Sequence, residues 1–178
     1  MTKTLIYCSQ RSEAQPLINF LKLTQKTNVQ DLPLGNEIYT SQDDDYLLVV
    51  SGTGKENCQK SLEFIYKNYE ISKALHIGTA GCSDSSIKVG TLFCTNRLLP
   101  NINFAPVTTV DQPLETDEDL ETLLVDMEAK HFQEISKQYF NDIYTFKVVS
   151  DYLDIEAAND DLIKKIIENS FDKLKKYL

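Results

Sequence analysis

Segments typical of buried strands alternate along this chain with segments typical of amphipathic helices, and this alternation limits the possible folds more than any other feature. Apolar, strand-like runs occupy residues 4–8, 46–51, 74–77 and 143–149. Apolar residues at helical spacing follow several of these runs, and an amphipathic segment closes the chain. Strands that alternate with helices in this way favour an α/β fold with a central, partly parallel sheet.

The remaining segments predict connections and shorter elements around that sheet. Residues 37–40 and 46–51 predict a hairpin around an acidic turn. The interval 96–122 contains three prolines and predicts loops with one short strand near 107–110. After it, a strand over 123–126 should lead into a helix over 127–140. Because the 178 residues contain neither a repeat nor a linker, we expect one domain spanning residues 1–178.

Composition excludes several classes of function. A formal net charge of −9 argues against binding to nucleic acid or to an anionic membrane, since both require basic surfaces. No run approaches the roughly 20 apolar residues that span a bilayer, and the N-terminus lacks the apolar stretch of a signal peptide. We therefore expect a cytoplasmic protein. The four cysteines lack metal-ligand spacing, which favours reduced thiols and no bound metal.

Glycine, serine and acidic residues gather where the predicted strands end. Such groups occur at residues 51–54, 78–81, 126–128 and 150–151. In open α/β sheets, ligands bind outside the carboxyl ends of the strands. Glycine allows the backbone to approach a ligand closely, and a helix N-terminus follows the first group. The spacing of a phosphate-binding Walker loop is absent. The combination suits a polar, oxygen-rich ligand or an anion, while each glycine turn taken alone, including residues 78–81, is typical of a tight connection between elements.

Taken in order, these motifs resemble those of the nucleoside phosphorylase/nucleosidase superfamily, especially the methylthioadenosine/S-adenosylhomocysteine nucleosidases. The matching segments are SGTGK at 51–55, HIGTAG at 76–81, KVGTLF at 88–93, VDMEA at 125–129 and VVSD at 148–151. The resemblance implies a three-layer, nucleoside phosphorylase-like fold with a central mixed sheet flanked by helices. It also implies a small-molecule nucleoside substrate, no cofactor, and a homo-oligomer that we expect to be a dimer.

The same resemblance implies roles for individual residues. Asp151 would protonate the purine at N7, and Ser150 would orient it. Glu128 would accept hydrogen bonds from ribose hydroxyls while Met127 packs on the sugar, and Glu13 would activate water. The glycine-rich segments supply the remaining expected binding residues: Ser51, Gly52 and Gly54 around the nucleophile, and Thr79, Ala80 and Gly81 along the base.

Other interpretations remain open. Glu13 also suits the first turn of a helix, Asp151 also suits a turn or cap, and His76 is typical of a satisfied core or interface histidine. The interval 96–126 is shorter than in the family, which leaves a non-catalytic nucleoside-binding relative as an alternative. Phosphate-dependent cleavage is a further one, although the chain has only two arginines, Arg11 and Arg97, to bind phosphate.

Overall fold

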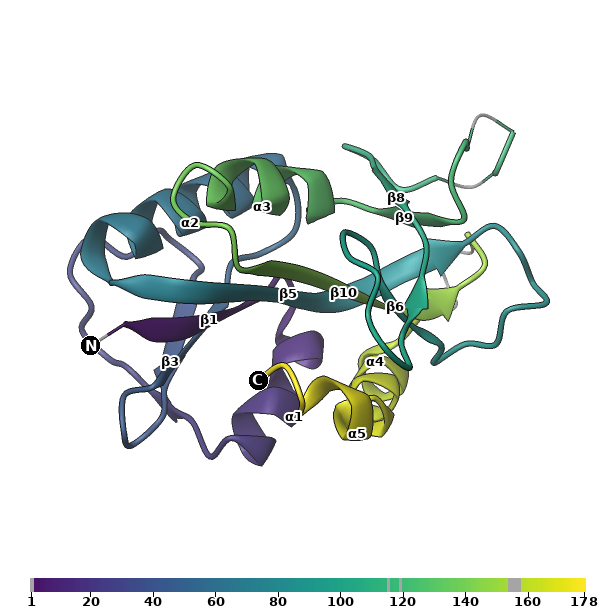
Figure 1. Ribbon diagram of the computed structural model, residues 1–178. Coiled ribbons are helices and arrows are strands. Elements are labelled where there is room, and N and C mark those ends of the chain that lie inside the picture. The colour runs from purple at the N-terminus through teal and green to yellow at the C-terminus, as the bar shows by residue number, and fades with distance from the viewer. Residues whose placement is uncertain (1, 115, 119, 154–157) are drawn as a thin grey trace.

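The computed structural model describes residues 2–114, 116–118, 120–153 and 158–178. Figure 1 shows three layers, with a central sheet between two groups of helices. One face is covered by α2 (Lys55–Asn68) and α3 (Ala129–Ser136). The other is covered by α1 (Arg11–Phe20), α4 (Asp160–Asn169) and α5 (Phe171–Leu174). The expected α/β fold, with a central mixed sheet flanked by helices, is confirmed. None of the described helices is both long and apolar enough to cross a membrane.

The sheet is mixed, and its main path runs in the order β2-β3-β4-β1-β5-β10-β6-β7. Strands β4, β1, β5 and β10 are parallel neighbours, whereas β3 and β6 join them in antiparallel orientation. The strands are β1 (Lys3–Cys8), β2 (Thr24–Gln25), β3 (Glu37–Thr40), β4 (Tyr46–Val50), β5 (Ile71–Cys82), β6 (Leu92–Cys94), β7 (Asn103–Phe104), β8 (Val107–Thr109), β9 (Leu124–Asp126) and β10 (Ile143–Asp151).

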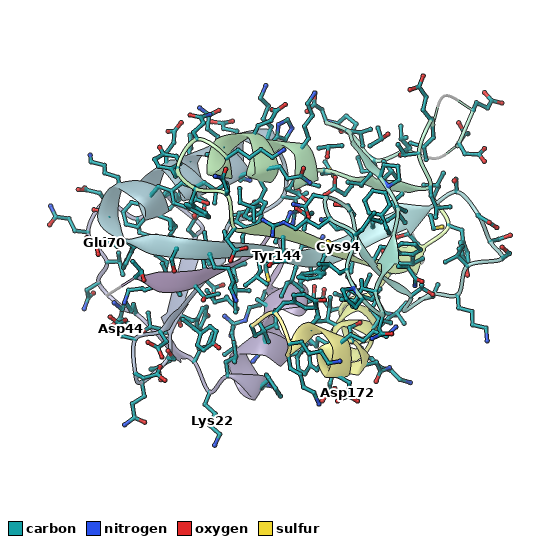
Figure 2. All side chains as sticks on the ribbon, viewed as in Figure 1. Lys22, Asp44, Glu70, Cys94, Tyr144 and Asp172 are labelled. Carbon is teal, nitrogen blue, oxygen red and sulfur yellow. The ribbon has the colours of Figure 1, made fainter. Side chains whose placement is uncertain are left out.

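The strands are apolar on both sides because helices cover both faces of the sheet. In β1, Ile6 and Cys8 belong to the core beneath α1 and α4, while Leu5 and Tyr7 belong to the core beneath α2 and α3. This is the twofold alternation of side chains that a strand imposes. Figure 2 shows the complementary outer layer, where exposed charged residues such as Lys22 and Asp172 lie at the rim of the molecule.

Strand β5 changes partners along one edge, and this exchange creates the space for a site. Its first half pairs with β1, as far as the register Tyr7 to His76. Its last residues pair instead with the short antiparallel β9, in which Val125 lies opposite Gly81. Between these two partners no strand of the described residues borders the edge of β5, so the backbone amide of Thr79 can bond to a side chain.

Several boundaries differ from the sequence-based expectation. Residues 78–81, expected as a tight connection, belong to β5 because β10 pairs with them. The helical spacing of Leu17, Ile18 and Leu21 predicts a helix from about Glu13, and helix α1 begins two residues earlier, at Arg11. Helix α3 spans only Ala129–Ser136, since the residues after it form a turn whose aromatic rings pack on Tyr66. The closing helix divides at Ser170, whose hydroxyl donates to the Ile166 carbonyl.

Candidate active site

A cavity of about 260 Å³ opens at the carboxyl ends of the central strands. This is the edge at which open α/β sheets bind ligands. Four carboxylates from three distant parts of the sequence line it: that of Glu13, those of Asp126 and Glu128, and that of Asp151. Apolar residues, including Leu114, Val125 and Ile163, form other parts of the wall. A wall that combines apolar surface with a few polar groups is typical of small-molecule sites.

Glu13 fills the gap in the sheet edge between β1 and β9. Its Oε1 accepts hydrogen bonds from the Thr79 amide at 2.8 Å and the Thr79 hydroxyl at 3.0 Å. Its Oε2 accepts from the amide and hydroxyl of Ser9, at 3.2 and 3.0 Å, and from the Gln10 amide at 3.0 Å. The bond to Gln10 also caps α1. Glu13 is therefore both a first-turn residue of this helix and a lining residue of the cavity.

Lys147 is the central cation of the site, and sequence reasoning missed it. Its side chain is 1% exposed, and its Nζ lies 2.7 Å from Asp126 Oδ2. Burial alone would lower the pKa of Lys147, but the carboxylates of Asp126, Glu128 and Glu13 outweigh it and hold that pKa above its usual value. A lysine in the apolar run of β10 was the available signal, because such a residue must find a partner when buried.

Glu128 lies at the N-terminal end of α3, almost completely buried. Its Oε1 accepts a hydrogen bond of 2.7 Å from the Gly54 amide at the start of α2. Burial is the main reason that its pKa is raised to about 7, and the charges of Asp126 and Glu13 act in the same direction. Lys147 and the Gly54 amide partly oppose this increase. The carboxyl group therefore changes its protonation state near neutral pH.

Asp151 ends β10 on the opposite side of β5 from Glu128. Its Oδ2 accepts a 2.6 Å hydrogen bond from the Ser150 hydroxyl, and its Oδ1 accepts a 3.0 Å bond from the Leu153 amide. Leu153 has a φ of +64°, a conformation that bulky residues rarely adopt. A Cβ on Gly81 would lie 3.0 Å from the Leu153 side chain and 3.2 Å from Asp151 Oδ1, so a larger residue here would require these side chains to shift.

The other expected binding residues fall into two groups. Met127, Thr79, Ala80, Gly81 and Ser150 line the cavity together with Glu13, Glu128 and Asp151. Ser51, Gly52 and Gly54 are not among its lining residues, although Thr53 of the same segment is. Their polar groups bond within the protein: the Ser51 hydroxyl to Tyr7, the Gly52 amide to the Ser9 carbonyl, and the Gly54 amide to Glu128.

Neither arginine lines this cavity. Arg11 bonds to Glu37 and Tyr39, and its guanidinium lies 4.9 Å from the centre of the Tyr39 ring. Arg97 lies over the Tyr144 ring of β10. The described lining residues include neither lysine nor arginine. The ionisable side chains among the described lining residues are therefore all acidic, with Lys147 buried behind them.

His76 lies behind the cavity rather than in its lining. It is fully buried on β5, with its Nε2 3.1 Å from Lys147 Nζ. Ligand-type atoms of His76, Asp126 and Glu128 lie within 4.8 Å of one another. Because the Lys147 ammonium bonds to two of these three residues, the lysine supplies the positive charge at this point.

Comparison with known proteins identifies the fold. No protein-family model matches the sequence, and no curated protein does so either. Among solved structures, the 5'-methylthioadenosine/S-adenosylhomocysteine nucleosidase from Helicobacter pylori, with butyl-thio-DADMe-Immucillin-A, has a TM-score of 0.80 at 15% identity. The match covers 99% of this chain and 97% of that one. The futalosine hydrolase of Helicobacter pylori strain 26695 has a TM-score of 0.79 at 15% identity, covering 98% and 96%.

A third structure agrees with these two. The nucleosidase from S. pneumoniae, with the transition-state inhibitor MT-ImmA, has a TM-score of 0.79 at 17% identity and covers 97% of this chain and 96% of that one. The matches span nearly the whole of each protein. The chain has the three-layer fold of the nucleosidases, as its motifs predicted.

Proposed function

We propose that the protein hydrolyses the N-glycosidic bond of a purine nucleoside of the methylthioadenosine/S-adenosylhomocysteine type. One observation supports this proposal above the others. Glu13, Glu128 and Asp151 come from three separate parts of the chain, and all three line one cavity. Carboxylates that meet from distant segments suit the protonation of a leaving group, the binding of a sugar and the activation of water.

The order of the strand ends suggests how a nucleoside would lie. Asp151 and Glu128 stand on opposite sides of the β5 segment that contains Ala80 and Gly81. A base beside Asp151 would then place its ribose beside Glu128, whose oxygens can accept from two neighbouring hydroxyls. Transfer of a proton from Asp151 to N7 makes the base a better leaving group, and positive charge develops on the ribose.

Water would attack from the side of Glu13. The hydroxyls of Ser9 and Thr79 bond to the Glu13 carboxylate, and both residues line the cavity. A water molecule can replace one of these rotatable hydroxyls as a donor to Glu13 and pass its proton there during attack. The backbone donors from Ser9, Gln10 and Thr79 keep the carboxylate fixed meanwhile.

The charges favour water over phosphate as the nucleophile. A phosphate dianion would enter a cavity that four carboxylates line, and both arginines are engaged elsewhere. Incubation with methylthioadenosine, adenosine or inosine should therefore release free base equally well with and without phosphate. Release that depends on phosphate would show that the protein is a phosphorylase.

Replacement of Asp151 tests the assignment of the acid. Asp151→Asn should abolish base release while nucleoside binding, measured by calorimetry, remains largely intact. Asp172→Asn, an exposed position on α5, is the matched control and should behave like the wild type. Wild-type turnover in Asp151→Asn would remove Asp151 from the mechanism.

A second candidate function is nucleoside binding without turnover. The observation that favours it is that internal hydrogen bonds engage both carboxylate oxygens of Glu13 and both of Asp151. Tight binding of methylthioadenosine without release of adenine would support this alternative. The expected homodimer also remains a prediction, which sedimentation equilibrium can test.

A further inference from the structure

A buried histidine next to the site is not used by the mechanism above. The His76 side chain is fully enclosed, and its only hydrogen-bond partner among the described residues is the Lys147 ammonium, 3.1 Å from Nε2. The other ring nitrogen, Nδ1, is buried without a hydrogen-bond partner among the described residues. A buried polar atom without a partner destabilises the folded protein. Stability therefore does not explain why a histidine occupies this position.

The contact with Lys147 determines the protonation state of the ring. An ammonium group has three donors and no lone pair, so Nε2 must be the acceptor in this hydrogen bond. The ring proton then resides on Nδ1. Burial first, and the Lys147 charge second, lower the pKa of His76 well below its usual value. His76 is therefore a neutral acceptor rather than a proton donor to its neighbours.

The surroundings of the ring hold it in one orientation. Tyr7 of β1 meets it edge-on, with ring centres 4.9 Å apart and an angle of 87° between the planes. Phe132 of α3 packs on it, with ring centres 5.1 Å apart. These contacts aim Nε2 at Lys147, whose Nζ also bonds to Asp126 at 2.7 Å. Two fixed acceptors thus constrain the direction of the ammonium.

We propose that His76 is a positioning residue that fixes the Lys147 ammonium behind the carboxylates of Glu13 and Glu128. This inference rests on the proposed hydrolysis for its effect on rate. Its geometric part does not depend on that reaction. Lys147 Nζ lies near the place where Glu13 would activate water, since a Cβ on Gly78 would lie 3.2 Å from Nζ and 3.0 Å from Glu13 Oε1. A displaced ammonium would alter the field at both carboxylates.

The tautomer of His76 tests the geometry without reference to activity. Long-range ¹H–¹⁵N spectra of the wild-type protein at pH 7 distinguish the two ring nitrogens. We expect a neutral ring protonated on Nδ1, with Nε2 shifted as an acceptor. A ring protonated on Nε2, or a cationic ring, would overturn the proposal. If the wild type proves to release no base, this measurement still decides whether His76 holds Lys147.

A pair of variants tests the effect on catalysis. His76→Gln can place its side-chain oxygen near the position of Nε2, whereas His76→Met has similar length but no comparable acceptor. In His76→Met we expect kcat to fall by at least about tenfold with KM nearly unchanged, because only the positioning is lost. His76→Gln should recover most of this loss.

The variants also separate positioning from packing. Wild-type kcat in a folded His76→Met protein would refute the proposal. An equal loss of kcat in both variants, with native stability, would do so as well. If His76→Met does not fold, the tautomer and the rate of His76→Gln decide the question. A role in packing alone would change the thermal midpoint and not the ratio of kcat between the two variants.

Discussion

Replacement of Glu128 by glutamine should make the folded protein more stable at alkaline pH while it impairs the site. The pKa of the buried Glu128 carboxyl is raised from its ordinary 4.5 to about 7, chiefly by burial. Each pKa unit corresponds to 1.36 kcal/mol, so ionised Glu128 costs the folded protein about 3 kcal/mol. Glutamine avoids this cost, and its side-chain oxygen can still accept from the Gly54 amide, which bonds to Glu128 in the wild type.

The sign of the effect depends on pH in a defined way. Below pH 4.5, Glu128 is protonated in both the folded and the unfolded chain, so the substitution gains nothing. Between pH 4.5 and 7 the unfolded chain releases the proton first, and the stability of the wild type is lost progressively as the pH rises. Above pH 7 the full penalty applies. Glu128→Gln should therefore gain about 3 kcal/mol at pH 8 relative to pH 4.5, because the shift to about 7 already includes the opposing attraction to Lys147.

Urea unfolding at a series of pH values measures this difference directly. Glu134→Gln is the matched control, because Glu134 is exposed on the same helix, α3, and should show no comparable change with pH. A difference between Glu128→Gln and the wild type that does not grow from pH 4.5 to pH 8 would refute the reasoning. Base release by the variant should fall at the same time, which is the trade-off expected where a site stores an unfavourable charge.

Three further predictions concern the same cluster. Lys147→Met removes the buried cation that pairs with Asp126. The free energy of unfolding, measured in urea at pH 7, should fall by about 3–5 kcal/mol. A loss below about 1 kcal/mol would contradict the buried ion pair. Gly78→Ala places a Cβ 3.0 Å from Glu13 Oε1. In a folded protein kcat should therefore fall by about 100-fold. An unchanged kcat would show that the new methyl group and the Glu13 carboxylate can move apart. KM for the nucleoside should rise as the pH falls below about 7, because protonated Glu128 loses its charge-assisted hydrogen bonds to ribose. A pH-independent KM would exclude Glu128 from ribose binding.

Local sequence patterns are enough to predict the layers of the fold and the edge at which the cavity opens. The apolar runs in β1, β4 and β10 are continuous because helices cover both faces of the sheet, and such runs are visible without any structure. Parallel strands bring their carboxyl ends to one edge. Asp151, which ends β10, therefore had to lie there, whereas Glu128 follows the antiparallel β9, and only the tertiary structure brings it to the same cavity.

The tertiary structure alone decided which groups meet behind that edge. Lys147, His76 and Asp126 belong to three different strands, and their contacts span up to 71 residues of sequence. The apolar run around Lys147 indicates a buried lysine that needs a partner, but it does not show which partner, because the contacts and the pKa depend on charges that distant segments supply. The partners of the Glu13 carboxylate could not be predicted from the sequence for the same reason. Its residue type suits any helix N-terminus, and only the unpaired edge of β5 gives its carboxylate the Thr79 amide as a partner.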